Sequence, residues 1–476
     1  MSSTRRFAVP LPLRRTALAV ALLSLAAAAW AATVAPPPAG RQQSPTHSPV
    51  GMAVVAATRP ASAQLDLGAW PTDRVFQADT LELPARLRGD PDRPLTCTVQ
   101  TILSEYRPNQ TAATLHSHQR TVTLRPGEIA DVSVRLAAPA PGPYHFRLAV
   151  STGNELLAQQ EGTLLYRPQS WALPNLEPRD FDAFWQSTLA EMRTRPLEVK
   201  WHEAGEKPAP EPFREISFTG LGNRRIRGYL GIPPQLKPGQ KAPAILSLPS
   251  ASYHSAAVDL KAVEQGYVFL ALSIHDMPFG GDSYRTHPKP HWFAEEYQGI
   301  GRQSKETFYY RAAYVAGPRA IDFLRSLPQV DPRKIVVSGM SQGGSLALAT
   351  AALQPDIALA EADVPGRSRM DLLTTTYKAN MSLPPPAGMT AWEMFEKTLA
   401  YFDVSYFARR IRCPIVMRMS LDDPVNPGPL QYWAFLQLKQ SPDARNVLMP
   451  GLKHQTPPDR EGHGAAMRQK YAPPAR

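Results

Sequence analysis

Apolar residues follow different patterns in the two parts of this chain. From about residue 174 onward, runs such as 244–248, 267–272 and 447–449 are apolar almost throughout, with segments of helical spacing between them. Continuous apolar runs are typical of parallel strands that are covered on both faces. The pattern therefore predicts an α/β domain at 174–476 with a mostly parallel central sheet.

Helical segments are marked at three places in this domain. Residues 177–192 carry acids in their first turn and apolar residues on one face. Residues 306–324 form a longer segment, in which Pro318 is expected to produce a kink. The third segment, 345–353, follows almost directly on a β-branched run at 334–338.

The earlier part of the chain alternates instead. Between residues 62 and 167, short runs of alternating polarity are separated by turn residues and recur about every dozen residues. This spacing predicts a small all-β domain, an antiparallel sandwich of the immunoglobulin type. Tyr144 is either the corner tyrosine of such a domain or an ordinary half-buried strand residue. Domain packing is the expected role, ahead of carbohydrate binding or an oligomer contact.

The first residues indicate export. Four arginines precede an apolar stretch that ends in a small-x-small cleavage site at 29–31, so residues 1–31 are predicted to be a secretory signal peptide. An uncleaved anchor is the alternative, and the pair Arg5-Arg6 leaves a twin-arginine route open. Residues 32–61 are rich in Pro, Ala and Ser and are expected to form a linker. The mature chain is thus expected to be periplasmic or secreted, without stable membrane insertion.

Charge and composition narrow the range of functions. The net charge of the 476 residues is +11, and cleavage would remove four arginines and no acid, which leaves +7. Dense basic blocks with interleaved aromatic residues are absent from the sequence, so nucleic acid is not an expected partner. Cys97 and Cys413 are expected to be free buried thiols. The histidines lack the spacing of metal ligands, so neither a metal nor an organic cofactor is expected.

The most informative motif is Gly339-Met340-Ser341-Gln342-Gly343-Gly344. It stands between a short apolar strand and a good helix former, which is the context of a nucleophile elbow. The turn is so tight that a side chain at Gly339 or Gly343 would collide with neighbouring backbone. Ser341 is therefore predicted to be a catalytic nucleophile, with an ordinary Gly-Ser turn as the alternative.

A serine nucleophile needs an imidazole to take its proton and a carboxylate to orient that imidazole. On an α/β-hydrolase fold the acid and then the histidine follow the serine, each after a strand. Asp422 and Asp423 follow one apolar run, and His454 follows the next. Asp423 is preferred over Asp422 because it stands directly before the turn at Pro424. Chain position favours His454 over His463.

The reaction also needs two N–H donors for the oxyanion. One is expected from Gln342, directly after the nucleophile at a helix N-terminus. The other is expected from Ala251, with Ser250 as the close alternative. Tyr253 and Phe279 are candidates for the wall of an acyl pocket, and ordinary core packing is an equal alternative for both.

With these residues identified, the α/β domain resembles the acetyl xylan esterase/cephalosporin C deacetylase family, serine esterases that remove acetyl groups from carbohydrates. The resemblance runs in matching order from about 175 to 455. It is carried by the GxSQGG pattern at 339–344 and by three further stretches, 180–185, 306–311 and 398–403. It implies Ser341, Asp423 and His454 as the triad and the amides of Ala251 and Gln342 as the oxyanion hole. Because members of the family form oligomers, it also implies a homo-oligomer.

Two positions depart from the family pattern. The family's Arg-Gly-Gln motif is replaced by His275-Asp276-Met277, close to the expected active site, and its His-Glu pair is His454-Gln455 here. The all-β domain and the signal peptide also lie outside the family's core pattern. Together they indicate an exported relative of the cytoplasmic deacetylases.

The sequence thus predicts a serine carboxylic ester hydrolase that removes small acyl groups, acetyl above all, through an acyl-enzyme. Its expected partner is an acylated carbohydrate or another small ester. A prolyl-oligopeptidase-like peptidase is one alternative, although such enzymes usually carry Tyr where this chain has Gln342 and need a far larger N-terminal propeller. A non-catalytic carbohydrate-binding relative is the other.

Overall fold

The computed structural model describes residues 61–68, 70–108, 110–136, 139–203, 210–251, 257–276, 297–375, 384–459 and 462–474. These residues belong to one compact unit. The predicted signal peptide and nearly all of the predicted linker lie outside the described residues. Within the described segments, no helix combines the length and the apolar character that crossing a bilayer requires.

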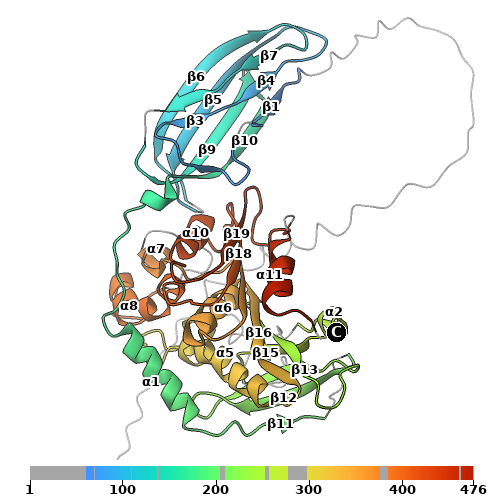
Figure 1. The fold of residues 1–476 in the computed structure, drawn as a ribbon. Helices are drawn as coiled ribbons and strands as arrows, with labels where there is room; N and C mark the ends of the chain where they lie inside the picture. The colour runs from blue at the N-terminus through green and yellow to red at the C-terminus, as the bar shows by residue number, and fades with distance from the viewer. Residues whose placement is uncertain are drawn as a thin grey trace, which may run out of the picture. The chain divides into compact units, whose positions relative to one another are not determined.

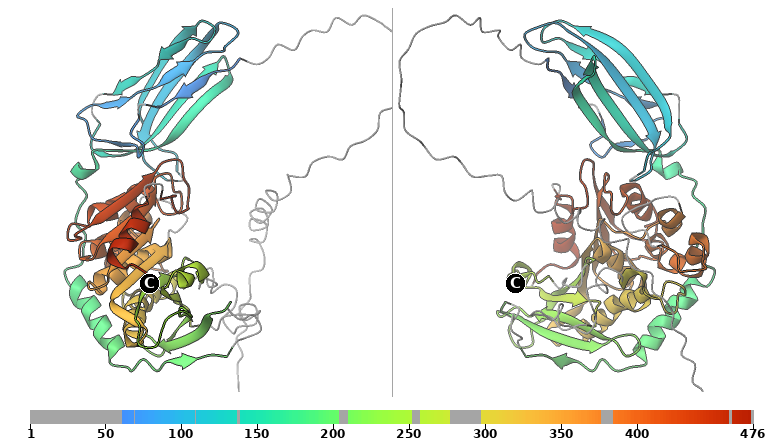
Figure 2. Two further views of the ribbon diagram at one scale, coloured as in Figure 1. Left: turned by 45° about the vertical axis from the view of Figure 1, so that its right-hand side comes forward. Right: turned by 180° about the vertical axis from the view of Figure 1, so that it is seen from behind.

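Strands make up the first part of the described chain. They are β1 (Gln64–Asp66), β2 (Val75–Phe76), β3 (Leu81–Leu83), β4 (Arg86–Arg88), β5 (Leu95–Glu105), β6 (Thr114–Leu124), β7 (Ile129–Asp131), β8 (Val134–Leu136), β9 (Gly142–Thr152) and β10 (Glu155–Tyr166). The larger sheet has the order β2-β10-β9-β5-β6, and two smaller sheets have the orders β1-β4-β7 and β3-β8. Figure 2 shows these strands, coloured blue to green, layered against one another.

The three sheets pack as a sandwich because β5 and β9 bury alternate residues on one face. Leu103 and Phe146 pack in a cluster with Leu83 of β3. Four residues earlier on the same face, Val99 packs in a second cluster with Leu87 of β4. Both small sheets therefore cover the same face of the larger sheet, as the period-two pattern of the sequence leads one to expect.

The second part of the chain adds helices to a long sheet. Its strands are β11 (Lys200–Trp201), β12 (Phe213–Thr219), β13 (Arg225–Gly231), β14 (Ala242–Leu248), β15 (Val268–Ser273), β16 (Val330–Met340), β17 (Leu359–Asp363), β18 (Ile415–Ser420) and β19 (Ala444–Met449). Its helices are α1 (Phe181–Arg193), α2 (Leu260–Glu264), α5 (Tyr309–Ser326), α6 (Gln342–Leu353), α7 (Met370–Thr375), α8 (Ala391–Lys397), α9 (Val404–Ala408), α10 (Gly428–Leu436) and α11 (His463–Tyr471). Short 3₁₀ turns are η1 (Pro168–Ser170), η2 (Tyr297–Gly299) and η3 (Leu399–Phe402).

The sheet of this part is mixed, with a parallel majority. Its order is β11-β12-β13-β15-β14-β16-β17-β18-β19. The pairs from β11 to β15 are antiparallel, and the pairs from β15 through β14 to β19 are parallel. The carboxyl ends of β16, β18 and β19 therefore lie at one edge of the sheet, where ligand sites of such sheets are built.

Helices cover both faces of this sheet (Figure 1). On one face, Leu246 of β14 packs in the main core with Trp185 of α1 and Tyr314 of α5. The next residue in sequence, Ile245, points to the other face and belongs to a second core with Met467 of α11. Burial on both faces explains why β14 and β15 are apolar almost throughout instead of alternating.

The family-like stretches outside the elbow hold helices together. The indole N–H of Trp185 donates to the carbonyl oxygen of Tyr401 at 2.9 Å, and the Tyr314 hydroxyl donates to that of Phe402 at 2.9 Å. Asp180 accepts hydrogen bonds from Tyr401 at 2.5 Å and from Lys305 at 2.7 Å. These contacts join α1, α5 and η3, so these stretches support the fold. Cys97 and Cys413 are both free and buried, which confirms their prediction.

Candidate active site

The motif at 339–344 forms a sharp turn between β16 and α6. Ser341 has φ 59° and ψ −119°, a conformation that side-chain-bearing residues rarely adopt, and its N–H donates to Asp363 O at 2.8 Å. A Cβ atom on Gly339 would lie 2.3 Å from Gly343 O, and one on Gly343 would lie 2.4 Å from Leu248 O. The backbone therefore accepts only glycine at both positions, as the motif predicted.

Ser341 is the first member of a hydrogen-bonded chain of three side chains. Its Oγ lies 2.9 Å from Nε2 of His454, and Nδ1 of His454 lies 2.8 Å from Oδ2 of Asp423. His454 follows β19 and Asp423 follows β18, so adjacent parallel strands deliver the two residues to the same edge. The side chain of Asp423 is buried, whereas that of His454 is 24% exposed. This arrangement can withdraw a proton from the serine hydroxyl.

The carboxylate of Asp423 is oriented by its own loop. Oδ1 accepts the backbone N–H groups of Val425 at 2.8 Å and Asn426 at 3.0 Å. Oδ2 accepts Nε2 of Gln431, on α10, at 3.0 Å in addition to the contact with His454. Reasoning from the sequence missed Gln431, because nothing in its surroundings marks a residue of α10 as a partner of the acid.

Asp422, the alternative acid, faces other groups. Its Oδ1 accepts the N–H of Thr163, on β10, at 2.6 Å. Its Oδ2 accepts the N–H of Gly451 at 2.6 Å and lies 3.3 Å from Nη1 of Arg74. Asp422 thus links the loop that carries Asp423 to the strands of the first part and to the loop that carries His454. His463, the alternative histidine, begins α11, and its N–H donates to Asp459.

Gln342 holds the turn in place through its side chain. Its Oε1 accepts the hydroxyls of Tyr297 at 2.7 Å and Tyr310 at 2.5 Å. Its Nε2 donates to Pro249 O at 3.4 Å and Ser250 O at 3.3 Å, which ties the turn to the loop after β14. Burial raises the pKa of both tyrosines, so each remains a neutral donor. Sequence reasoning assigned only the backbone N–H of Gln342, although the glutamine of the motif was a visible signal.

The loop after β14 carries Ala251, which the sequence predicts as the second donor. Ser250 Oγ donates to Met340 O at 3.0 Å, so this loop lies directly against the elbow. Ala251 follows Ser250 in this loop and is exposed. Tyr253 and Phe279 lie outside the described residues.

His275, which stands where the family has its Arg-Gly-Gln motif, is buried. Its Nδ1 lies 2.6 Å from the hydroxyl of Tyr309, and its ring packs edge-on against Tyr297 at 4.7 Å. Because Tyr297 in turn binds Gln342, His275 belongs to the packing behind the elbow. Across the described segments, no cluster of three His, Cys, Asp or Glu side chains could bind a metal ion.

Much of this chain is similar to known proteins. Residues 165–461 match the family model of acetyl xylan esterase (AXE1). Over 266 residues the chain is 32% identical to acetyl esterase Axe7A of Xylanibacter ruminicola, and this match covers 54% of the chain and 59% of that protein. The chain thus spans about three fifths of the length of this curated relative.

Two solved structures share the fold. The acetyl xylan esterase from Paenibacillus sp. R4 has a TM-score of 0.52 at 22% identity. Acetyl xylan esterase 1 from Thermoanaerobacterium sp. JW/SL YS485 has a TM-score of 0.51 at 24% identity. Each match covers 64% of this chain and 98% of the other, and together they show an α/β-hydrolase-like fold.

The family model covers more than half of the chain, and the resemblance carried by the motifs is thereby confirmed. This chain belongs to the acetyl xylan esterase family, whose members are carboxylic ester hydrolases.

Proposed function

We propose that this chain hydrolyses carboxylic esters of carbohydrates, acetyl esters above all, through an acyl-enzyme on Ser341. One observation carries the proposal: the hydrogen-bonded chain from Ser341 through His454 to Asp423, with contacts of 2.9 and 2.8 Å. Ser341 lies on a strained turn between a strand and a helix, of the kind that exposes a nucleophile.

In the first half-reaction, Nε2 of His454 takes the proton of Ser341 Oγ as the oxygen attacks the acyl carbonyl carbon. The carbonyl electrons move onto its oxygen, which the N–H groups of Gln342 and Ala251 stabilise. When the tetrahedral intermediate collapses, the bond to the sugar oxygen breaks and His454 returns its proton to that oxygen. The products are a free sugar hydroxyl and acyl-Ser341.

Water completes the second half-reaction by the same route. His454 takes a proton from the water as its oxygen attacks the acyl carbon, and then gives that proton to Ser341 Oγ. The carboxylic acid is released and the serine hydroxyl is restored. Asp423 keeps the Nδ1 proton of His454 in place throughout, so that Nε2 is the nitrogen that accepts. Protein groups and the attacking water supply every proton of this cycle, and the proposed steps include no cofactor.

The finer assignments of organisation belong to the same proposal. Residues 62–167 form an immunoglobulin-type domain ahead of the catalytic domain at 174–476. The Tyr144 hydroxyl donates to Ala140 O four residues upstream, which supports the tyrosine corner of such domains. Export to the periplasm or the medium, after removal of residues 1–31, places the enzyme where acetylated plant polysaccharide would be met. A homo-oligomer stays a prediction.

The proposal is tested by ester hydrolysis with the chain from residue 32 onward. p-Nitrophenyl acetate, butyrate and octanoate are compared in parallel with a Ser341→Ala variant. We expect turnover that falls steeply with acyl length and is lost in the variant. A fluorophosphonate probe should label the wild-type chain and not Ser341→Ala.

Activity that persists in Ser341→Ala would contradict the assignment of the nucleophile. Equal rates on the acetate and octanoate esters would contradict a preference for acetyl groups, and the chain would then be an esterase of broad acyl specificity. Labelling by the probe without hydrolysis of any ester would instead point to a peptidase.

A further inference from the structure

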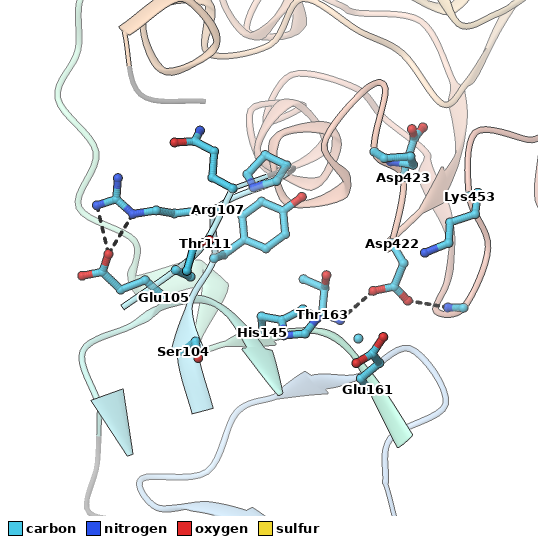
Figure 3. Close-up of a pocket in the computed structure, with 17 residues that line it drawn as sticks. Ser104, Glu105, Arg107, Thr111, His145, Glu161, Thr163, Asp422, Asp423 and Lys453 are labelled. Atoms are coloured by element: carbon cyan, nitrogen blue, oxygen red, sulfur yellow. Dashed lines mark hydrogen bonds and ion pairs between the residues drawn. The ribbon is translucent and has the colours of Figure 1, made fainter. Parts of the chain in front are cut away.

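A cavity of about 730 Å³ adjoins the predicted catalytic acid. One wall comes from the segment that joins β5 to β6 and from β9 and β10, and the other from the loops that follow β18 and β19 (Figure 3). Asp423 itself lines the cavity, and so does Lys453, the neighbour of His454. The cavity therefore lies against the two loops that carry the predicted acid and base.

One carboxylate holds these walls together. Asp422 accepts the N–H groups of Thr163 and Gly451, both at 2.6 Å, and so joins β10 to both loops (Figure 3). The close approach occurs at Gly162, whose φ of +154° is rarely adopted by residues with a side chain, and where a Cβ atom would lie 3.1 Å from Oδ1 of Asp422. These hydrogen bonds link the two walls directly, and walls that are linked in advance lose less conformational entropy when a ligand binds.

The lining offers hydrogen-bond donors and acceptors of several kinds. Glu105 and Glu161 provide carboxylate acceptors, and Arg107 and Lys453 provide cationic donors. Tyr106 adds an aromatic ring. Each sugar hydroxyl can donate and accept at once, and sugar rings present apolar C–H faces, so a mixed polar lining with an aromatic ring suits a carbohydrate.

Charge distinguishes between kinds of carbohydrate. Most charged groups at the cavity are balanced: Glu105 pairs with Arg107 and Asp422 with Arg74, and the carboxylate of Asp423 is buried. This leaves Glu161 and Lys453, one charge of each sign, among the lining residues. Because this lining has no excess of positive charge, uronates, sulfates and phosphates would gain no net electrostatic attraction from it. The volume lies within the range of about 300–1,000 Å³ that is usual for small-ligand sites. The lining therefore matches a neutral polyhydroxyl chain.

We propose that this cavity is a subsite for the neutral sugar chain that carries the ester, so that the β-sandwich supplies part of the substrate site. The inference rests on the proposed ester hydrolysis, because it names the part of that substrate which the sandwich binds. It assigns to the sandwich a specificity role beyond domain packing.

The test compares a small ester with an acetylated neutral oligosaccharide. Arg107 and Glu161 lie on the sandwich wall of the cavity, apart from the predicted triad. The double variant changes both residues to alanine. The quantity measured is kcat/KM on acetylated xylohexaose divided by kcat/KM on p-nitrophenyl acetate. We expect this ratio to fall roughly tenfold in the double variant, because hydrogen bonds to the sugar are lost. The fall should come from a higher KM for the oligosaccharide. Arg135→Ala is the matched control, since Arg135 is also exposed on the sandwich and paired with a glutamate, Glu82, and does not line the cavity. Its ratio should equal that of wild type.

A ratio unchanged in the double variant would overturn the subsite, and so would an equal fall in Arg135→Ala. Failure of the wild-type chain on both esters would instead overturn the proposed function. The subsite is then tested by calorimetric titration of Ser341→Ala with unsubstituted xylohexaose. Binding that is abolished by Arg107→Ala supports the subsite. No binding, or tighter binding of an oligogalacturonate, overturns it.

Discussion

Asp422 and Asp423 are adjacent in the sequence, but their carboxylates serve different contacts. Oδ1 of Asp423 accepts two N–H groups of its own turn, which leaves Oδ2 for His454 and Gln431. Asp422 binds backbone N–H groups of other segments. At the scale of single residues, the partner of each oxygen decides which of two like side chains is suited to orient an imidazole.

Asp423→Asn should abolish most turnover while the chain stays folded. The amide oxygen of the asparagine will stay with the N–H groups of Val425 and Asn426, so its NH₂ group faces Nδ1 of His454. Nδ1 must then accept a hydrogen bond, so the ring proton is on Nε2. Nε2 faces the hydroxyl of Ser341 and can no longer take its proton. We expect kcat on p-nitrophenyl acetate to fall by roughly 10⁴-fold.

The surface variant Asp356→Asn is the control for this substitution, since Asp356 is exposed and pairs with Arg325. It should keep its activity, and thermal unfolding should show that both variants fold. Turnover of Asp423→Asn near that of wild type would contradict the role assigned to Asp423.

The carboxyl group of Asp403 should make the free energy of unfolding depend on pH. It is fully buried, and loss of solvation raises the pKa of this carboxyl to about 6, although it accepts the N–H groups of Met370 and Ser405. Between pH 4 and 6 the folded chain then binds more protons than the unfolded chain, so the free energy of unfolding falls as pH rises. The loss from this group is roughly 2–3 kcal/mol.

Urea unfolding at pH 4, 5, 6 and 7 measures this loss by comparison with Asp403→Asn. The asparagine costs stability at every pH because its NH₂ group faces a backbone donor, but it does not titrate. The free energy of unfolding of wild type minus that of Asp403→Asn should therefore fall from pH 4 to pH 6 and stay constant above pH 6. A difference that is independent of pH would refute the prediction.

At the scale of elements, the nucleophile turn depends on backbone approaches that side chains would prevent. Gly343→Ala would put Cβ 2.4 Å from Leu248 O, a backbone atom within the sheet that cannot easily move. We expect a loss of about 1–3 kcal/mol in unfolding free energy, and lower kcat because Ser341 is displaced. The comparison is Gly388→Ala, where φ is +78° and no atom lies within 4 Å of the added Cβ.

Gly388→Ala should cost about 1–2 kcal/mol from its left-handed backbone alone and leave kcat unchanged. Chemical unfolding and ester hydrolysis on both variants separate the two effects. Equal kcat in Gly343→Ala and wild type would show that the turn tolerates a side chain.

The same elements show where reasoning from sequence succeeds. Apolar runs located β14, β15 and β18, because strands covered on both faces are apolar almost throughout. The edge strand β19 was located only by its last three residues, since its Arg445 and Asn446 are exposed. The helix expected from residue 177 begins at Phe181, since Pro178 and Asp180 precede its first turn. The antiparallel strands β12 and β13 were missed, because residues such as Arg214, Glu215 and Arg227 interrupt their apolar pattern.

At the scale of the whole molecule, contacts between distant segments complete the site. Chain order placed Ser341, Asp423 and His454 each after a strand, and the structure brings them together. The hydrogen bonds that support these three residues cannot be predicted from the sequence. Gln342 binds Tyr297 and Tyr310, more than thirty residues away, and such pairings depend on how the chain folds back.

Among the described residues, Asp422 makes the side-chain hydrogen bond of greatest sequence separation, with Arg74, and it joins the sandwich to the loops that carry Asp423 and His454. Asp422→Ala would remove acceptors from the N–H groups of Thr163 and Gly451 and the ion pair with Arg74. We expect the unfolding free energy to fall by about 1–3 kcal/mol, because the N–H of Thr163 is then buried without its acceptor. Because the loops of Asp423 and His454 lose a common anchor, kcat should also fall.

Asp422→Asn separates loss of the anchor from loss of charge. Asparagine keeps one acceptor oxygen, so it can restore one of the two backbone hydrogen bonds and should lie between wild type and Asp422→Ala in kcat. Amide hydrogen exchange should rise at Thr163 and Gly451 in Asp422→Ala and at one of them in Asp422→Asn. If kcat is equal in all three proteins while exchange rises, Asp422 fastens the sandwich without positioning the triad, because the loops then hold their geometry unaided.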